Sequence, residues 1–173
     1  MSWDFLANRA LEGQELSAAE AMSILDAGDD QLQDIMNAAL RVRERHFARD
    51  VRIHVLQNAK SGVCPEDCSF CSQSLSAQSG VERYRMQSVD ELVAGAKQAH
   101  AMGATTYCMV TATRGPSSNE LATVCEAVRQ IKSEMPLKVC TSLGILSAKD
   151  ATQLAEAGVD RFNHNLESSK RYF

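Results

Sequence analysis

The chain has 173 residues, of which 45% are hydrophobic and 23% are charged. This composition suits one soluble globular protein with a sizeable core. The formal net charge is -4, from 18 basic and 22 acidic residues, and aromatic residues make up only 5%. Because no basic face with interleaved aromatics is evident, the sequence argues against nucleic acid as a partner.

The opening sequence "MSWDFLANRALEG" lacks the basic-then-apolar pattern of a secretion signal and the Arg-rich, acid-poor pattern of a transit peptide. No apolar run approaches the roughly 20 residues that cross a bilayer. We therefore expect a cytoplasmic, reducing location and no membrane association. There the six cysteines are expected to be ligands, redox groups or buried apolar residues rather than disulfides.

Residues 1–49 are predicted to form a helical extension. Ser17 with Glu20 three residues later is the pattern of a capping box. The stretch 29–47 repeats apolar residues at helical spacing, namely Leu32, Ile35, Met36, Ala39 and Leu40. After this extension, "VRIHVLQ" (51–57) alternates and is rich in β-branched residues, so it predicts a strand followed by a long loop over 58–87.

A helix-then-strand unit then repeats. Each helix opens with a capping pair, which is Ser88 and Glu91, Ser117 and Glu120, or Ser147 and Asp150. The first helix is expected to bury Val89, Leu92, Val93, Ala96 and Ala99, and the second Leu121, Val124, Cys125, Val128 and Ile131. The strands that follow are "TTYCMVTA", "LKVCTSLG" and "DRFNHNL".

Alternating strands and helices predict an α/β fold with parallel strands joined by crossovers. The order fits either an open doubly wound sheet or part of a (β/α)8 TIM-type barrel. Four strands are too few to close such a barrel, which typically needs about 250 residues. The sequence stops just past the fourth strand, so we expect residues 50–173 to be the N-terminal half of a barrel.

Three cysteines lie together in the loop sequence "SGVCPEDCSFCSQS", at positions 64, 68 and 71. Thiolates at these spacings can surround one metal centre, and soft sulfur ligands select zinc, copper(I) or iron–sulfur clusters. Three ligands leave one position open for an exogenous ligand. The alternative is a structural zinc site that a remote residue such as Cys108 completes.

The CxxxCxxC spacing in a loop after the first strand of a βα repeat resembles the radical S-adenosylmethionine (SAM) enzymes. The resemblance implies that Cys64, Cys68 and Cys71 bind a 4Fe-4S cluster whose fourth iron receives SAM. It also implies that Phe70 lies against the adenine of SAM. The alternative for Phe70 is ordinary packing beside the cluster.

Cys108 and Cys140 fall in the middle of consecutive predicted strands, so both can point into the same interior. A buried strand cysteine is usually only a small hydrophobe. Cys125, on the apolar stripe of a helix, is assigned to the core.

The stretches "NAKSGVCPEDCSFCSQS", "GATTYCMV", "LKVCTSLGIL" and "LAEAGVDRFNHNLESS" resemble the biotin synthase family over about residues 50–173. The resemblance implies that Cys108 and Cys140 are two of four ligands of a 2Fe-2S cluster, the others lying on later strands. It also implies that Asn163 and Asn165 meet dethiobiotin and SAM and that Glu167 binds the SAM ribose. The alternative for these last residues is a capped turn with surface polar groups.

Some positions depart from the family pattern. Glu167 stands where Asp is commoner, and Thr106 stands where some members carry a basic residue. Val110 and Thr111 replace a pair of small residues. None of these changes removes a cluster ligand.

The implied function is insertion of sulfur into dethiobiotin, the last step of biotin biosynthesis, through a 5'-deoxyadenosyl radical and with the 2Fe-2S cluster as sulfur donor. A flavodoxin-type electron donor and a homodimer are also implied. One rival hypothesis is another radical SAM enzyme of the same branch, a mutase or lyase without the second cluster. The other is a truncated, non-catalytic chain that binds a cluster or zinc.

Overall fold

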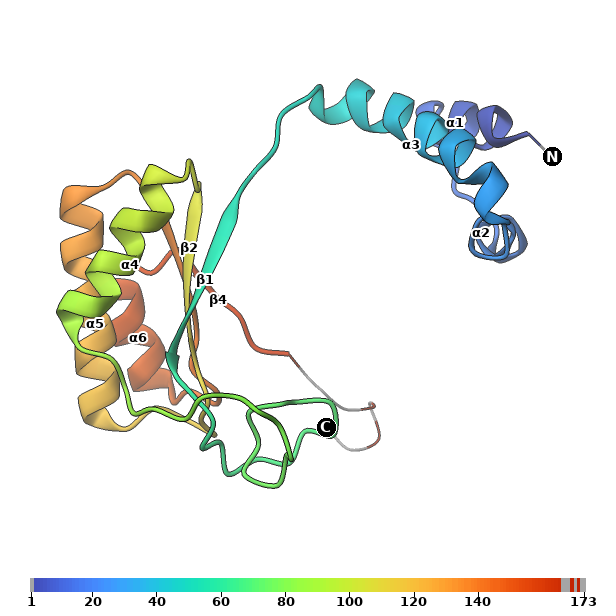
Figure 1. Cartoon of the computed structure of the whole chain (residues 1–173). Coiled ribbons are helices and arrows are strands. Elements are labelled where there is room, and N and C mark those ends of the chain that lie inside the picture. Colours follow the sequence, from blue (N-terminus) through green and yellow to red (C-terminus); the bar gives the residue numbers. More distant parts are fainter. Residues whose placement is uncertain (1, 166–168, 170, 172–173) are drawn as a thin grey trace. The chain divides into compact units, whose positions relative to one another are not determined.

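The computed structural model describes residues 2–165, 169 and 171, and these fall into two compact units, one up to Val51 and the other from Arg52 (Figure 1). The first unit contains α1 (Trp3–Leu11), α2 (Ala18–Leu25), the short 3-10 helix η1 (Asp29–Gln31) and α3 (Leu32–Phe47). None of the described helices is long and apolar enough to cross a membrane.

Polar contacts join the helices of the first unit. Arg41 on α3 donates to Asp4 and Asn8 on α1, at 2.6 and 2.7 Å. Ser17 and Glu20 form the predicted capping box at the start of α2, and Glu20 also pairs with Arg9. The helices that the sequence predicts in residues 1–49 are present as α1, α2 and α3.

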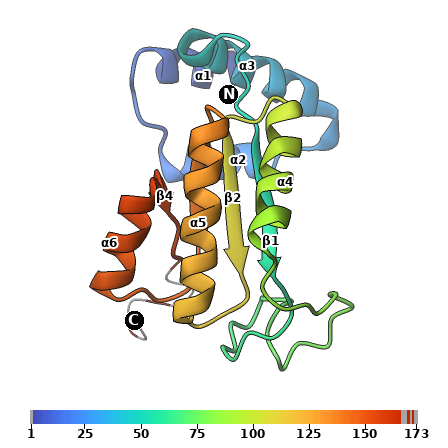
Figure 2. The ribbon, with the colours of Figure 1, turned by 90° about the vertical axis from the view of Figure 1, so that its left-hand side faces the viewer.

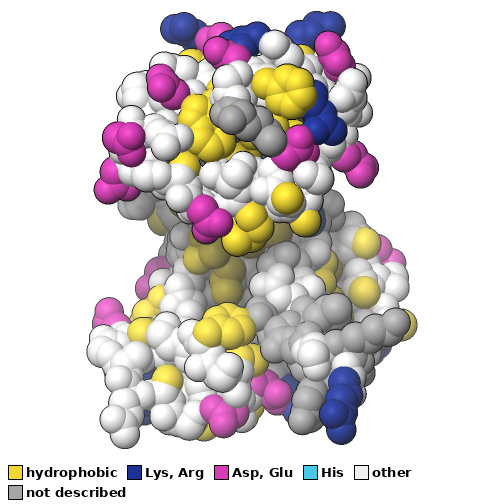
Figure 3. Space-filling model, turned by 90° about the vertical axis from the view of Figure 1, so that its right-hand side faces the viewer, with side chains coloured by type: hydrophobic (Ala, Val, Ile, Leu, Met, Phe, Trp, Pro, Cys, Tyr) yellow, Lys and Arg dark blue, Asp and Glu magenta, His cyan; other side chains and the backbone are white. Residues whose placement is uncertain are grey.

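The apolar stripe of α3 is not wholly buried. Ala38 is buried, whereas Leu32, Met36 and Leu40 are exposed. Figure 3 shows hydrophobic side chains reaching the surface of this unit.

The second unit is a four-stranded parallel sheet with strand order β1-β2-β3-β4. In chain order its elements are β1 (His54–Lys60), α4 (Val89–Ala101), β2 (Thr106–Thr111), α5 (Ser118–Glu134), β3 (Lys138–Ser142), α6 (Ala148–Ala157) and β4 (Arg161–Phe162). The three helices cover the same face of the sheet (Figures 1 and 2). Sequential strand order with helices on one side is the arrangement of a βα barrel, and it excludes a doubly wound sheet within the described residues.

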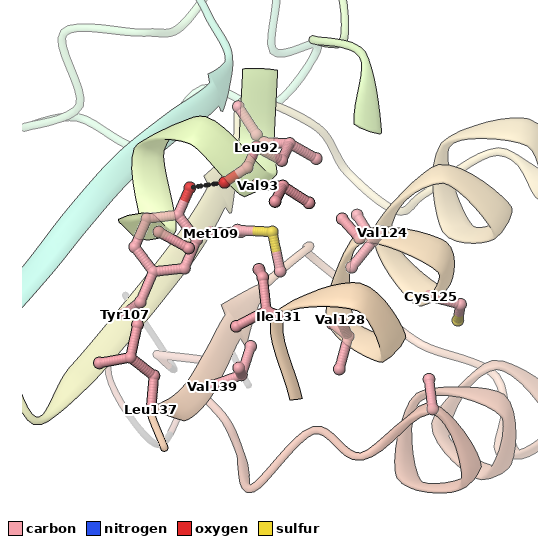
Figure 4. Close-up of a cluster of buried hydrophobic side chains, with 14 of the residues drawn as sticks. Leu92, Val93, Tyr107, Met109, Val124, Cys125, Val128, Ile131, Leu137 and Val139 are labelled. Carbon is pink, nitrogen blue, oxygen red and sulfur yellow. Dashed lines mark hydrogen bonds between the residues drawn. The ribbon is translucent and has the colours of Figure 1, made fainter. Parts of the chain in front are cut away.

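The core lies between this sheet face and the helices (Figure 4). The apolar residues predicted for α4 and α5 line it, and all are buried except Val89, which is half-buried. Cys125 belongs to this core, as expected. Tyr107, Met109 and Val139 supply the sheet side of the core.

All three predicted capping boxes are present at α4, α5 and α6. Each Ser side chain accepts from the N3 backbone N–H, and each N3 carboxylate accepts from the Ser backbone N–H. Gly158 ends α6 in the left-handed conformation, with φ +101°.

The first strand begins later than predicted. We expected residues 51–57, whereas β1 spans His54–Lys60. Alternation alone does not set strand ends, because a residue joins a sheet only where a neighbouring strand pairs with it. Ladder pairing with β2 begins at His54 and Thr106.

A β-bulge interrupts β1 near its end. Asn58 pairs with Val110, but Lys60 pairs with Thr111, so Ala59 is an extra residue. The Ala59 carbonyl instead accepts from the Gln87 N–H at 2.9 Å. The bulge turns Lys60 toward α5, where its ammonium contacts Glu120 at 2.7 Å.

Candidate functional site

The three clustered cysteines lie in the loop between β1 and α4, which runs over residues 61–87 at the carboxyl end of the sheet (Figure 2). The two limbs of the loop are joined at their base. Ser61 and Tyr84 exchange two backbone hydrogen bonds, at 3.1 and 3.2 Å, and the Tyr84 hydroxyl donates to the Asn58 carbonyl at 2.6 Å. The loop therefore leaves and returns to the sheet at a fixed place.

The backbone of Cys64 is held on both sides. Its N–H donates to the Gln73 carbonyl at 3.2 Å, and its carbonyl accepts from the Leu75 N–H at 3.0 Å. The Gln73 side chain accepts from the Gly62 N–H at 3.1 Å and from Asn58 at 3.3 Å. Gln73 thus ties the segment after the third cysteine to the end of β1.

Cys64, Cys68 and Cys71 are each half-buried. The Cys71 N–H donates to the Cys68 carbonyl at 2.9 Å, which closes a turn between the last two cysteines. Phe70, within this turn, is 70% exposed. Its ring is therefore available to a ligand on the surface of the loop.

No three His, Cys, Asp or Glu side chains in the described residues converge as they would around a single metal ion. A cubane cluster does not require this convergence, because each thiolate binds a different iron. Three half-buried thiols in one anchored loop are the soft donors that such a cluster uses. The donor set thus fits an iron–sulfur cluster.

Cys108 and Cys140 are direct register partners on β2 and β3. Their neighbours Tyr107, Met109 and Val139 point into the helical core, so the cysteines lie on the opposite face of the sheet. Burial and a hydrogen bond with the Cys140 thiol raise the pKa of Cys108 to about 12. The structure therefore brings together the two cysteines, as the strand pattern predicted.

Cross-strand pairing places these cysteines in a row. The row runs from Leu56 through Cys108 and Cys140 to Arg161. Leu56 is 63% exposed, and Arg161 is also exposed. Sequence reasoning did not single out Arg161, because its place beside Cys140 depends on strand register rather than on a local motif.

The asparagines follow β4 directly. The Asn163 N–H donates to the Thr141 carbonyl at 2.8 Å, and the side chains of Asn163 and Asn165 are exposed. His164, between them, stacks on Phe162 with ring centroids 6.5 Å apart. Glu167 lies outside the described residues.

Both acids of "CPEDC" have partners, and sequence reasoning missed them. Glu66 accepts from Arg114, which follows β2, at 2.7 Å. Asp67 accepts from the Ser76 hydroxyl at 2.5 Å, and Ser76 also contacts Ser74 at 2.8 Å. The charges between Cys64 and Cys68 are therefore used to hold the loop.

The family model described as the radical SAM superfamily matches residues 59–173 of the chain. The match begins one residue before the end of β1 and includes the cysteine loop and the three strands after it. The chain belongs to the radical SAM superfamily. Membership of this superfamily implies a 4Fe-4S cluster and SAM as cofactors.

Similar proteins narrow the place of the chain within the superfamily. The biotin synthase of Salinibacter ruber is 58% identical over 172 residues, which are 99% of this chain and 48% of that protein. The biotin synthase of Bacillus licheniformis is 45% identical over 168 residues, 97% of this chain and 50% of that protein. The chain thus spans about half the length of these relatives.

Two solved structures share the fold. Methylornithine synthase (PylB) aligns with a TM-score of 0.73 at 21% identity, over 91% of this chain and 46% of that chain. HydG, a maturase of the [FeFe]-hydrogenase, aligns with a TM-score of 0.63 at 16% identity, over 92% and 36%. These alignments, which cover 46% and 36% of the solved chains, confirm the expected half-barrel fold.

Proposed function

We propose that the protein carries out the biotin synthase reaction and that this chain supplies the first half of its radical SAM barrel. The observation that carries the proposal is that two separate groups of cysteines occur in the same unit. A three-cysteine loop lies at the carboxyl end of β1, and Cys108 and Cys140 form a register pair on the face of the sheet opposite the helices. Similarity to biotin synthases favours this function over a mutase, a lyase or a non-catalytic chain.

Cys64, Cys68 and Cys71 would hold the 4Fe-4S cluster, and Cys108 and Cys140 would supply two ligands of a 2Fe-2S cluster. When bound, these groups and SAM supply a 5'-deoxyadenosyl radical and the sulfur. The chain itself positions the reactants and excludes water. The hydrogen bonds that anchor the loop would fix the position of the first cluster, and the β2–β3 register would fix the position of the second.

The small-molecule substrate would be dethiobiotin, and it would lie between the two centres. Phe70 is proposed to contact the adenine of SAM, and Asn163 and Asn165 are proposed to contact dethiobiotin and SAM from the end of β4. Glu167 keeps its proposed role at the SAM ribose. Residues 1–49 would be an extension that precedes the catalytic barrel. A flavodoxin-type electron donor, a homodimer and a cytoplasmic location complete the proposal.

The test is anaerobic reconstitution with iron and sulfide, followed by electron paramagnetic resonance of the reduced protein. We expect a 4Fe-4S signal that changes when SAM is added. Cys64→Ala should abolish this signal, whereas Cys125→Ala, which alters a core cysteine, should leave it intact. Binding of zinc without iron would contradict the proposal.

The second centre needs a separate test in the full-length protein. Cys108→Ala should lower the iron content by about two atoms per chain, the content of one 2Fe-2S cluster. It should also stop sulfur insertion while cleavage of SAM continues. Normal product formation by this variant would rule out the sulfur-donor role.

A further inference from the structure

The loops after β1, β2 and β3 are linked to one another at the carboxyl end of the sheet. Arg114 lies in the loop after β2, and its carbonyl accepts from the Ile145 N–H, in the loop after β3, at 2.7 Å. Gly144 makes this approach possible. Its φ is +75°, and a Cβ built there would lie 2.4 Å from the Arg114 carbonyl oxygen. The backbone of Arg114 is thus seated against the loop after β3.

The side chain of Arg114 reaches in the other direction, to the cysteine loop. Its Nη1 donates to Oε1 of Glu66, which lies between Cys64 and Cys68. The other loop contacts described above run to β1 or within the loop itself. The Arg114–Glu66 ion pair therefore adds a tie from the side of β2 and β3.

We propose that Arg114 is a positioning residue, which fixes the cysteine loop relative to the strands that carry Cys108 and Cys140. The inference deepens the proposed function and rests on it for its significance, because a substrate held between two centres requires a set separation. The side chains of Arg114 and Glu66 are 67% and 38% exposed. An exposed pair adds little to global stability, so its effect is expected in the local order of the loop.

The direct test measures how fast iodoacetamide alkylates each cysteine in the metal-free full chain, by peptide mass spectrometry. In Arg114→Met we expect Cys64 and Cys68 to react about fivefold faster, the factor that an exposed ion pair at the upper end of its usual range can supply. Cys125 in the helical core serves as an internal reference. Its rate and the melting temperature should not change.

A matched control removes a different exposed ion pair. Lys97→Met breaks the contact between Lys97 and Glu134, which are 2.8 Å apart and join α4 to α5. These side chains are 58% and 43% exposed, which is similar to the exposure of Arg114 and Glu66. The control should leave the loop cysteines at the wild-type rate, and equal rates in the two variants would overturn the proposal.

Charge exchange distinguishes pairing from general loosening. The double variant Arg114→Glu with Glu66→Arg should restore slow alkylation, whereas Arg114→Glu alone should not. Fast alkylation of Cys64 and Cys68 in the double variant would overturn the proposal. This holds whatever the rate at Cys125 in the single variant. After reconstitution, Arg114→Met should release iron to a chelator faster than wild type. Failure of the wild type to take up iron would contradict the proposed function and leave the alkylation result standing.

Discussion

The Tyr107 hydroxyl links β1, β2 and α4 inside the core. The side chain is fully buried, and its oxygen lies 2.7 Å from Gln57 Oε1. It also lies 3.0 Å from the Leu92 carbonyl oxygen (Figure 4). Gly95 leaves room for this arrangement, because a Cβ there would lie 1.6 Å from Gln57 Oε1. Burial raises the pKa of Tyr107 above its usual value, so the hydroxyl stays protonated and can donate.

Replacing this tyrosine should destabilise the sheet–helix contact. Tyr107→Phe keeps the ring but removes the hydroxyl that contacts Gln57 and the Leu92 carbonyl. We expect a loss of about 1–2 kcal/mol in the free energy of unfolding, measured by urea denaturation. Tyr84→Phe, in the loop, removes a less buried hydroxyl and should cost less. An unchanged unfolding midpoint for Tyr107→Phe would show that these contacts add no net stability.

At the scale of single residues, the sequence predicts a functional role only where the interacting residues are close together in the chain. The three loop cysteines are recognisable because their spacing is itself the motif. Arg114 and Glu66 are 48 positions apart and look like ordinary surface charges. Their contact depends on how two loops meet at the end of the sheet, and no local pattern encodes that meeting.

At the scale of helices and strands, capping boxes explain why the sequence predicts where the helices start. Each box needs only a Ser and an acid three residues later, so it is complete within one turn. Strand ends are different, because they depend on pairing across the sheet. The sequence therefore predicted the starts of α4, α5 and α6 but placed β1 three residues early.

One capping acid has a second partner on another element. Glu120 caps α5 and also accepts from Lys60 at the end of β1. Burial alone would raise the pKa of Glu120, but the hydrogen bonds from Lys60 and Ser117 outweigh it and hold the pKa below its usual value. The folded state therefore binds this proton less readily than the unfolded state, so the stabilisation is present at neutral pH and is lost as the pH falls through the lowered pKa.

Glu120→Gln tests this pH dependence. At pH 7 we expect the variant to be less stable than wild type by about 1–2 kcal/mol in urea denaturation. The difference should shrink at acid pH, once the pH has fallen through the lowered pKa of Glu120 and the carboxylate of the wild type is protonated. Glu126→Gln, on the exposed face of the same helix, should show no comparable dependence. A difference of equal size at both pH values would exclude the charge as its source.

The whole molecule consists of two units joined by an exposed segment. Residues 48–53 follow α3 and precede β1, belong to no helix or strand, and are exposed throughout. Segments of this kind fit a protease active site more readily than helices do, because cleavage requires extended backbone.

Brief digestion with trypsin should therefore cut first after Arg49 or Arg52. Mass spectrometry should find a fragment that begins at residue 50 or 53. Arg45 is also exposed but lies within α3, so it serves as the control and should be cut later. Early cleavage at Lys97 or Lys132, inside helices of the second unit, would contradict this view of the segment.

The bulge at Ala59 has a consequence for how the protein tolerates changes in length. Side chains normally alternate along a strand, but at the bulge the consecutive residues Ala59 and Lys60 both meet the helix-covered face, so the extra residue does not shift the ladder. Deleting Ala59 would therefore leave Lys60 opposite Thr111 and facing Glu120, and would remove a buried methyl group and the carbonyl that accepts from Gln87. Loss of this one residue should thus cost stability in the core without moving the point at which the cysteine loop leaves the sheet.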